Sequence, residues 1–353
     1  MPDERQSFMD EVSKTKNREV EQVWVVKKTL HRNVTVKATR EIDLDSKGII
    51  QQFIHNQFLL HGHVISLGVF VIITSFSPLR VYTLDDNGWL VRIANKPYHP
   101  VNYNDFETFL TNVGSNNLFE FEPMRRFFDH TGYSRRQALF AHLLSDLGIE
   151  QSKVQSIRKQ VSDAVEDVVF NRRDMLGIAL NGNGQIGKKE SFFEVMRWDF
   201  ILDEDMKVYL IEANMSPNMM QTHFMARARN NNLLFSTINT IGYLHGSWNT
   251  NGIRDTDINV DLKVCFTKIC EICELKECWL CSKCLPNGMK QMLRTSYMEH
   301  VNRLSLQRVY PKPMDQEVAH RLLQEQNIRN ISREFINQAW ITAKCVEDDY
   351  WCS

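Results

Sequence analysis

Two acidic side chains and one amide side chain, Asp199, Glu212 and Asn214, interrupt the largely apolar stretch from Phe192 to Met219. The stretch has the pattern of two strands around an acidic turn at residues 203–205. Glu212 and Asn214 face the same side of one strand, and the turn brings Asp199 beside them. Buried carboxylates need a cation between them, and these oxygen ligands suit Mg²⁺. The pattern predicts a magnesium site; the alternative is a structural hairpin with solvent-exposed polar ends.

The order of residues in this hairpin resembles the signature of tubulin–tyrosine-ligase-like enzymes, F-E-(L)-(F)-G-x-D-F-(L)-(L)-D-x-x-(L)-K-x-(W)-L-(L)-E-(V)-N-x-S-P. The matching residues are Phe193, Glu194, Asp199, Phe200, Asp203, Lys207, Leu210, Glu212, Asn214, Ser216 and Pro217. The resemblance implies an ATP-grasp fold in which Asp199, Glu212 and Asn214 hold the Mg²⁺ of Mg-ATP. It also implies an enzyme that joins an amino acid, usually glutamate, to a tubulin tail or a similar acidic protein.

Three segments nearer the start of the chain extend this resemblance. Trp24 to Lys27 is similar to the strand that carries a phosphate-binding lysine, although Lys27 could equally be a solvated lysine. Ile49 to Ile54 is similar to the strand beside adenine, so Gln51 would line the adenine pocket. Arg92 lies in a segment similar to G-x-(L)-V-R-x-A, and the resemblance implies a catalytic role in which it steadies phosphates.

The segment from His61 to Phe70 departs from the pattern that it resembles, G-H-K-F-D-(L/I)-R. Val64, Ser66 and Gly68 stand at the positions of its lysine, aspartate and arginine. The loop at residues 28–35 also lacks the glycines that let backbone N–H groups approach phosphates. Each lost preorganised charge typically costs a few kcal/mol of transition-state stabilisation. A second hypothesis is therefore a pseudoenzyme, a binding protein that keeps the ATP-grasp scaffold.

All eight cysteines lie after residue 264. Six of them are clustered, at Cys265, Cys270, Cys273, Cys278, Cys281 and Cys284. Four of these six form two C-x₂-C pairs separated by four residues, which would suit a tetrahedral zinc site. The even count equally suits disulfides formed in an oxidising compartment. A cluster of reduced, partly buried thiols is the third interpretation.

With 353 residues, 43% of them hydrophobic, the chain can bury a large core. We expect an α/β (α+β), ATP-grasp-like fold with antiparallel sheets flanked by helices and a cysteine-rich C-terminal extension. The expected segments are an ATP-grasp region at 1–247, a cysteine-rich segment at 248–314 and C-terminal helices at 315–353. Helices are predicted at Ser134–Leu147, Ser152–Phe170, Gln221–His245, Asp315–Gln326 and Ser332–Ala343, with a turn at Asn181–Gln185. The family's further N-terminal domain is expected to be missing from this chain.

A net charge of −1 gives no global basic field for binding nucleic acid. An acidic protein tail would need a local basic face, and paired arginines and lysines are candidates for it. The alternative is that these pairs lie on ordinary solvated helix faces. These candidates are Arg125-Arg126, Arg135-Arg136, Arg158-Lys159, Arg172-Arg173 and Arg227 with Arg229. No apolar run has the length of a transmembrane helix. The resemblance implies a cytoplasmic or cytoskeletal protein acting on tubulin, and the cysteine cluster leaves the secretory lumen as the alternative.

Overall fold

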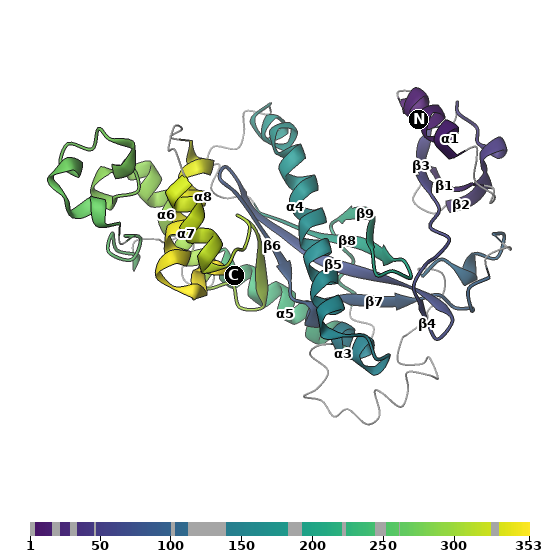
Figure 1. Ribbon diagram of the computed structural model, residues 1–353. Coiled ribbons are helices and arrows are strands. Elements are labelled where there is room, and N and C mark those ends of the chain that lie inside the picture. Colours follow the sequence, from purple (N-terminus) through teal and green to yellow (C-terminus); the bar gives the residue numbers. More distant parts are fainter. Residues whose placement is uncertain are drawn as a thin grey trace. The chain divides into compact units, whose positions relative to one another are not determined.

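The computed structural model describes residues 4–15, 22–28, 34–45, 47–99, 103–111, 139–182, 193–220, 224–243, 252–260, 262–325 and 332–353. Its helices are α1 (Arg5–Thr15), α3 (Leu139–Asp146), α4 (Gln151–Gly182), α5 (Phe224–Thr240), α6 (Asn287–Val301), α7 (Gln316–Glu325) and α8 (Arg333–Glu347) (Figure 1). Its strands are β1 (Val23–Lys28), β2 (Val34–Ala38), β3 (Gly48–Gln52), β4 (Leu59–Leu60), β5 (His63–Phe76), β6 (Leu79–Leu84), β7 (Leu90–Ile93), β8 (Glu194–Leu202), β9 (Val208–Met215) and β10 (Leu306–Tyr310). This mixture of helices with antiparallel strands confirms the predicted fold class.

The central strand of the larger sheet is β5, whose sequence HVISLGVFVIITSF is rich in β-branched residues and is buried along nearly its whole length. Such a continuous apolar run is typical of a strand covered on both faces. The sheet has the order β10-β6-β5-β8-β9, and β4 and β7 also pair with β5. The β5–β6 and β6–β10 pairs are antiparallel. β5 therefore has β8, the first strand of the predicted metal hairpin, as its direct neighbour.

A second sheet has the order β2-β1-β3, with both pairs antiparallel. Its short strands contain several valines and isoleucines, the residues that favour pleated structure. Val23 of this sheet packs with Phe53 and Phe109 in a small aromatic core. The rings of Phe53 and Phe109 meet edge to face, with centroids 5.7 Å apart.

The chain divides into two compact units, each with its own core. The first consists of Met1–Leu67, Val91–Gly132 and Ile201–Tyr209, and the second of Gly68–Leu90, Tyr133–Phe200 and Leu210–Ser353. In the second unit, α4 packs against β6 and β10 (Figure 1). One apolar cluster of this unit joins β5, β6 and α5, and a larger one joins α6, α7 and α8.

The largest differences from the predicted helix ends are found in α4 and α5. α4 continues beyond Phe170 to Gly182, because the added residues include good helix formers and no proline. Asn181 and Gly182 thus belong to a helix, which corrects the predicted turn, and residues 183–185 lie outside the described residues. α5 ends at Thr240, before the predicted end, because Gly242 adopts a positive φ of 76° and its N–H bonds the Asn239 carbonyl at 3.0 Å. This is the usual way in which a glycine terminates a helix.

The C-terminal helices pack around Trp340, whose side chain is completely buried. Its indole N–H donates to the Ile258 carbonyl oxygen at 2.8 Å and so fastens the segment at 252–260 to α8. Trp351, after the end of α8, packs edge to face against the same ring at 5.2 Å. The predicted C-terminal helices therefore form a core of their own within the second unit.

All eight cysteines form disulfides, which decides between the three interpretations of the cysteine cluster. The pairs are Cys265–Cys281, Cys270–Cys278, Cys273–Cys284 and Cys345–Cys352. Because a thiolate is the form of cysteine that binds zinc, the paired sulfurs provide no zinc ligands. The segment at 262–285 consists mostly of single 3₁₀ turns, so the three disulfides inside it substitute for regular secondary structure.

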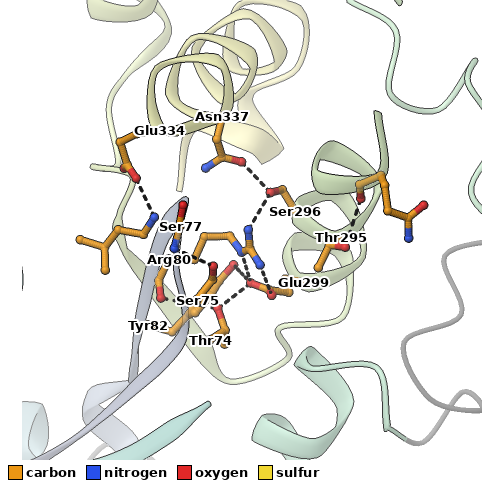
Figure 2. Close-up of polar contacts among 12 residues, drawn as sticks. Thr74, Ser75, Ser77, Arg80, Tyr82, Thr295, Ser296, Glu299, Glu334 and Asn337 are labelled. Atoms are coloured by element: carbon orange, nitrogen blue, oxygen red, sulfur yellow. Dashed lines mark hydrogen bonds and ion pairs between the residues drawn. The ribbon is translucent and has the colours of Figure 1, made fainter. Parts of the chain in front are cut away.

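A buried ion pair attaches α6 to the sheet. Arg80 of β6 donates to both carboxylate oxygens of Glu299, at 2.8 and 3.0 Å. Figure 2 shows that Thr74 and Tyr82 also point toward this carboxylate, and their hydroxyls donate to it at 2.7 and 3.3 Å. Burial, then the charge of Glu299, raises the pKa of Tyr82, so the phenol stays protonated and donates. Ser296 extends the network toward α8.

Candidate functional site

The predicted hairpin of β8 and β9 forms, and its turn is organised by Asp203. The Asp203 carboxylate accepts the backbone N–H groups of Asp205 and Lys207 at 3.0 and 2.9 Å, and the Tyr209 hydroxyl at 3.0 Å. An aspartate that bonds backbone groups two and four residues later stabilises a tight turn. Because the connection is short, β8 and β9 run antiparallel.

The three residues predicted to bind the cation converge on this hairpin. The side-chain amide nitrogen of Asn214 donates to Asp199 Oδ2 at 3.2 Å and to Glu212 Oε1 at 3.1 Å. Asp199 is buried, and Glu212 and Asn214 are intermediate in exposure. One nitrogen thus contacts both carboxylates. Rotation of the Asn214 amide would present its oxygen at the same place, giving three hard oxygen ligands.

A fourth side chain, Arg197, belongs to this cluster and was missed by the sequence analysis. Its Nε donates to Asp199 Oδ1 at 2.8 Å and its Nη2 to Oδ2 at 3.1 Å. The two side chains lie two residues apart on β8 and so share a face. They are 15% and 5% exposed, and such shielded, bidentate pairs are among the stronger ion pairs. The formal charges of Arg197, Asp199 and Glu212 sum to −1, which still favours a cation.

Gly68 of β5 lies beneath the Arg197 side chain. A Cβ atom on Gly68 would lie 3.1 Å from Arg197 Cδ, 3.2 Å from Asp199 Oδ1 and 3.2 Å from Leu90 Cβ. These distances are shorter than ordinary van der Waals contact, so a larger residue could enter only if its neighbours moved. The sequence did contain a signal for Arg197. Arg197 stands at the glycine position of the hairpin signature, and Gly68 stands at the arginine position of the pattern that residues 61–70 resemble.

Lys27, Gln51 and Arg92 lie in the first unit, whereas the hairpin carboxylates lie in the second. β1 and β3 pair with the register Val25↔Gln51 and Lys27↔Ile49, so the Lys27 and Gln51 side chains share one face of the small sheet. Arg92 lies on β7 and is intermediate in exposure. The roles proposed for these three residues remain predictions.

Val64 and Ser66, which replace charged residues of the pattern that residues 61–70 resemble, are packed within the first unit. Val64 is only 1% exposed, and its carbonyl oxygen accepts the Ala94 N–H at 2.8 Å. The Ser66 hydroxyl shares a 2.7 Å hydrogen bond with the Thr111 hydroxyl. Both positions are buried. A charged side chain at either position would be buried and would need a partner.

The basic pairs on α4 make contacts within the second unit. Arg158 bonds Asp86 at 2.5 Å, Lys159 bonds Asp163 at 2.5 Å, and Arg173 lies over the Phe170 ring at 3.8 Å. These contacts agree with the interpretation as ordinary helix faces. Arg125-Arg126 and Arg135-Arg136 lie outside the described residues. Among the helices that the structure describes, none is both long and apolar enough to cross a membrane.

Comparisons with known proteins agree with the hairpin signature. The sequence model of the Tubulin-tyrosine ligase family matches residues 1–245. The chain is 26% identical over 350 residues to "Probable tubulin polyglutamylase ttll-15" of Caenorhabditis elegans, a match that covers 94% of this chain and 64% of that protein. It is 30% identical over 177 residues to "Tubulin polyglutamylase TTLL7" of Xenopus tropicalis, covering 48% of this chain and 19% of that protein. It is 23% identical over 199 residues to "Tubulin monoglutamylase TTLL4" of Homo sapiens, covering 56% and 16%.

The chain thus spans 64% of the worm relative and less than a fifth of the other two. The family match ends near α5, and the disulfide-rich segment and α6 to α8 follow it. Because the match covers more than half of the chain and includes the hairpin that carries Asp199, Glu212 and Asn214, the chain belongs to the tubulin-tyrosine ligase family.

Proposed function

We propose that this protein is an ATP-dependent ligase that joins an amino acid, glutamate, to a tubulin tail or another acidic protein. The observation that carries the proposal is the convergence of Asp199, Glu212 and Asn214 around one point in a chain of this family. The names of the relatives, tubulin polyglutamylases and monoglutamylases, support glutamate as the added amino acid and tubulin as the acceptor. The proposed location is therefore cytoplasmic or cytoskeletal.

The side chains present fit Mg²⁺, because two carboxylates and one amide can supply hard oxygen ligands from a shielded hairpin. Among the described residues, no group of three or more His, Cys, Asp or Glu side chains gathers around a metal position, so the set consists of two carboxylates and the Asn214 amide. Asp199, Glu212 and Asn214 would hold the ion, which would offset the charge of the ATP phosphates. The disulfides leave no ligand set for zinc in the cysteine segment.

The proposed reaction has two steps. The γ-phosphoryl group of ATP passes to an acceptor carboxylate and ADP leaves; the amine of the incoming amino acid then attacks the acyl carbon, phosphate leaves, and the nitrogen loses a proton. Such a reaction depends on positioning and on fixed charges. We assign Lys27 and Arg92 to the phosphates and Gln51 to the adenine pocket. Residues 1–247 would form the ATP-grasp region, with 248–314 and 315–353 as the appended segments.

A second candidate is a pseudoenzyme that binds nucleotide or protein without ligase activity. The buried, uncharged Val64 and Ser66 favour it, because they lack the charges that stand at those positions in the family pattern. The disulfides bear on the cellular compartment of the protein. Disulfides persist in oxidising compartments, so the four pairs support the secretory lumen as the alternative to the cytoplasm.

The ligase proposal is tested by incubating the whole chain with Mg-ATP, isotopically labelled glutamate and tubulin, and measuring labelled tubulin peptides by mass spectrometry. Asp199→Asn is the matched control, since it removes one carboxylate and keeps the side-chain shape. We expect incorporation by the wild type and a loss of about 100-fold or more in the variant. Binding of Mg-ATP without incorporation into any acidic acceptor would favour the pseudoenzyme and contradict the ligase proposal.

A further inference from the structure

The site proposed above contains one strong positive group, Arg197, that has no counterpart in the hairpin signature. It lies in the second unit with Asp199 and Gly68. Its guanidinium bonds Asp199, and its Cδ would lie 3.1 Å from a Cβ atom on Gly68. Its side chain is 15% exposed, so it is shielded and still reaches solvent. A guanidinium held in this way is preorganised, because its carboxylate partner fixes the plane of the fork.

The two hydrogen bonds to Asp199 use two of the five N–H donors of the guanidinium. Among the described residues, the Arg197 guanidinium makes no other hydrogen bond. Three donors therefore remain for a ligand, in a planar arrangement that matches phosphate oxygens. Because Asp199 is also proposed to bind Mg²⁺, a phosphate group coordinated there would come within reach of the same guanidinium.

Gly68 explains why this arginine can occupy its position. The nearest atoms to a Cβ on Gly68 are the Arg197 stem, the Asp199 carboxylate and Leu90. A side chain on β5 at this point and the Arg197 side chain on β8 would compete for the same space. Side chains from two neighbouring strands can occupy the same region on one face of a sheet. The glycine on β5 therefore leaves this space to the positive group from β8.

We propose that Arg197 is a further phosphate-binding cation of this site, beside Lys27 and Arg92. It comes from β8, takes the place of the arginine that the family pattern has at Gly68, and is positioned by Asp199. This inference rests on the proposed nucleotide site. It also revises the count of lost charges: Val64 and Ser66 remove two charged groups, whereas the change at Gly68 moves one to the adjacent strand.

The test is an exchange between the two strands, read out by calorimetric affinity for Mg-ATP rather than by activity. Arg197→Gly should bind Mg-ATP about 10- to 100-fold more weakly, the usual effect of losing a hydrogen bond to a charged group. The double variant Gly68→Arg with Arg197→Gly should regain most of the affinity, because the arginine returns from β5. Arg197→Lys, which keeps the charge and loses the fork, should be intermediate.

Three controls separate this result from general damage. Arg158→Ala removes another ion-paired arginine of the same unit, bonded to Asp86, and should leave the affinity unchanged. Arg197→Gln replaces Arg197→Gly if circular dichroism shows that the glycine variant does not fold. Binding of Mn²⁺ alone, followed by electron paramagnetic resonance, should change little in the Arg197 variants.

Each remaining outcome overturns a defined part of the reasoning. An Arg197→Gly variant that binds Mg-ATP like the wild type overturns the inference. A loss of affinity that the exchange does not restore assigns Arg197 to holding Asp199, and also overturns a phosphate contact. Tighter Mn²⁺ binding with unchanged ATP affinity would mean that Arg197 occupies the metal's place. A wild type that binds no Mg-ATP overturns the proposed nucleotide site itself, and this inference with it.

Discussion

The Arg80–Glu299 pair predicts a large and specific loss of stability when the carboxylate is removed. Glu299 is 2% exposed and Arg80 5% exposed. Glu299→Ala would leave the Arg80 guanidinium buried without its counter-charge, and the hydroxyls of Thr74 and Tyr82 without their acceptor. Removing one partner of a buried pair typically costs about 3–5 kcal/mol. Because four hydrogen bonds end on this carboxylate, we expect about 4–5 kcal/mol here.

The assay is urea unfolding followed by circular dichroism. With a slope of about 3 kcal/mol/M for a unit of this size, a loss of 4 kcal/mol lowers the midpoint by roughly 1.3 M. Arg80→Met should have an effect of the same order. The double variant Arg80→Met with Glu299→Leu should be much less destabilised than the sum of the two, because no buried charge remains. Arg254→Ala, which removes an exposed pair with Asp257, is the control and should leave the midpoint nearly unchanged.

Additivity of the two single variants would refute this reasoning. It would mean that Arg80 and Glu299 contribute independently, so that the pair does not attach α6 to the sheet. A midpoint for Glu299→Ala within 0.2 M of the wild type, on the order of 0.6 kcal/mol with the same slope, would refute it equally. Such results would leave α6 fastened by its apolar contacts alone.

Three further predictions concern other parts of the molecule. Burial lowers the pKa of His300 to about 3, whereas the unfolded chain takes up that proton near pH 6.5. The stability that neutral His300 contributes is therefore fully present above pH 6.5 and is lost as the pH falls toward 3. The urea midpoint should accordingly fall less steeply between pH 7 and 4 in His300→Gln than in the wild type. Ser66→Ala leaves the half-buried Thr111 hydroxyl without its 2.7 Å partner and should lower stability by about 1 kcal/mol in thermal melts. An unchanged melting temperature would contradict the bond. Replacing Cys345 and Cys352 by serine opens a small covalent loop and should cost about 2 kcal/mol; alkylation of these cysteines in the native protein without reductant would show that the disulfide is absent.

The hairpin could be predicted from the sequence because its information is local. Asp199, Glu212 and Asn214 are separated by one short turn, and strand alternation alone places the last two on one face. The fold class was also predictable, since the apolar run of β5 and the periodic helices are read directly from residue order. The choice of the proposed ligands rested on residue type rather than on contact geometry.

Arg197 could not be assigned in the same way, because its role depends on a glycine in another strand. The sequence shows an arginine and a glycine far apart, and only the adjacency of β5 and β8 reveals that they share one space. The Arg80–Glu299 pair, whose members are 219 positions apart in the sequence, was inaccessible for the same reason. The cysteine pairing was equally out of reach, since six cysteines allow about 15 connectivities.

The central claim is that the β8–β9 hairpin binds the cation of Mg-ATP, and calorimetry tests it most directly. ATP is titrated into the wild type and into Glu212→Gln, each with and without Mg²⁺. We predict magnesium-dependent binding by the wild type and a loss of about 10-fold or more in the variant, because one of two carboxylates has become neutral. Wild-type protein of confirmed fold that binds no Mg-ATP, or a variant that binds as tightly as the wild type, would contradict the account.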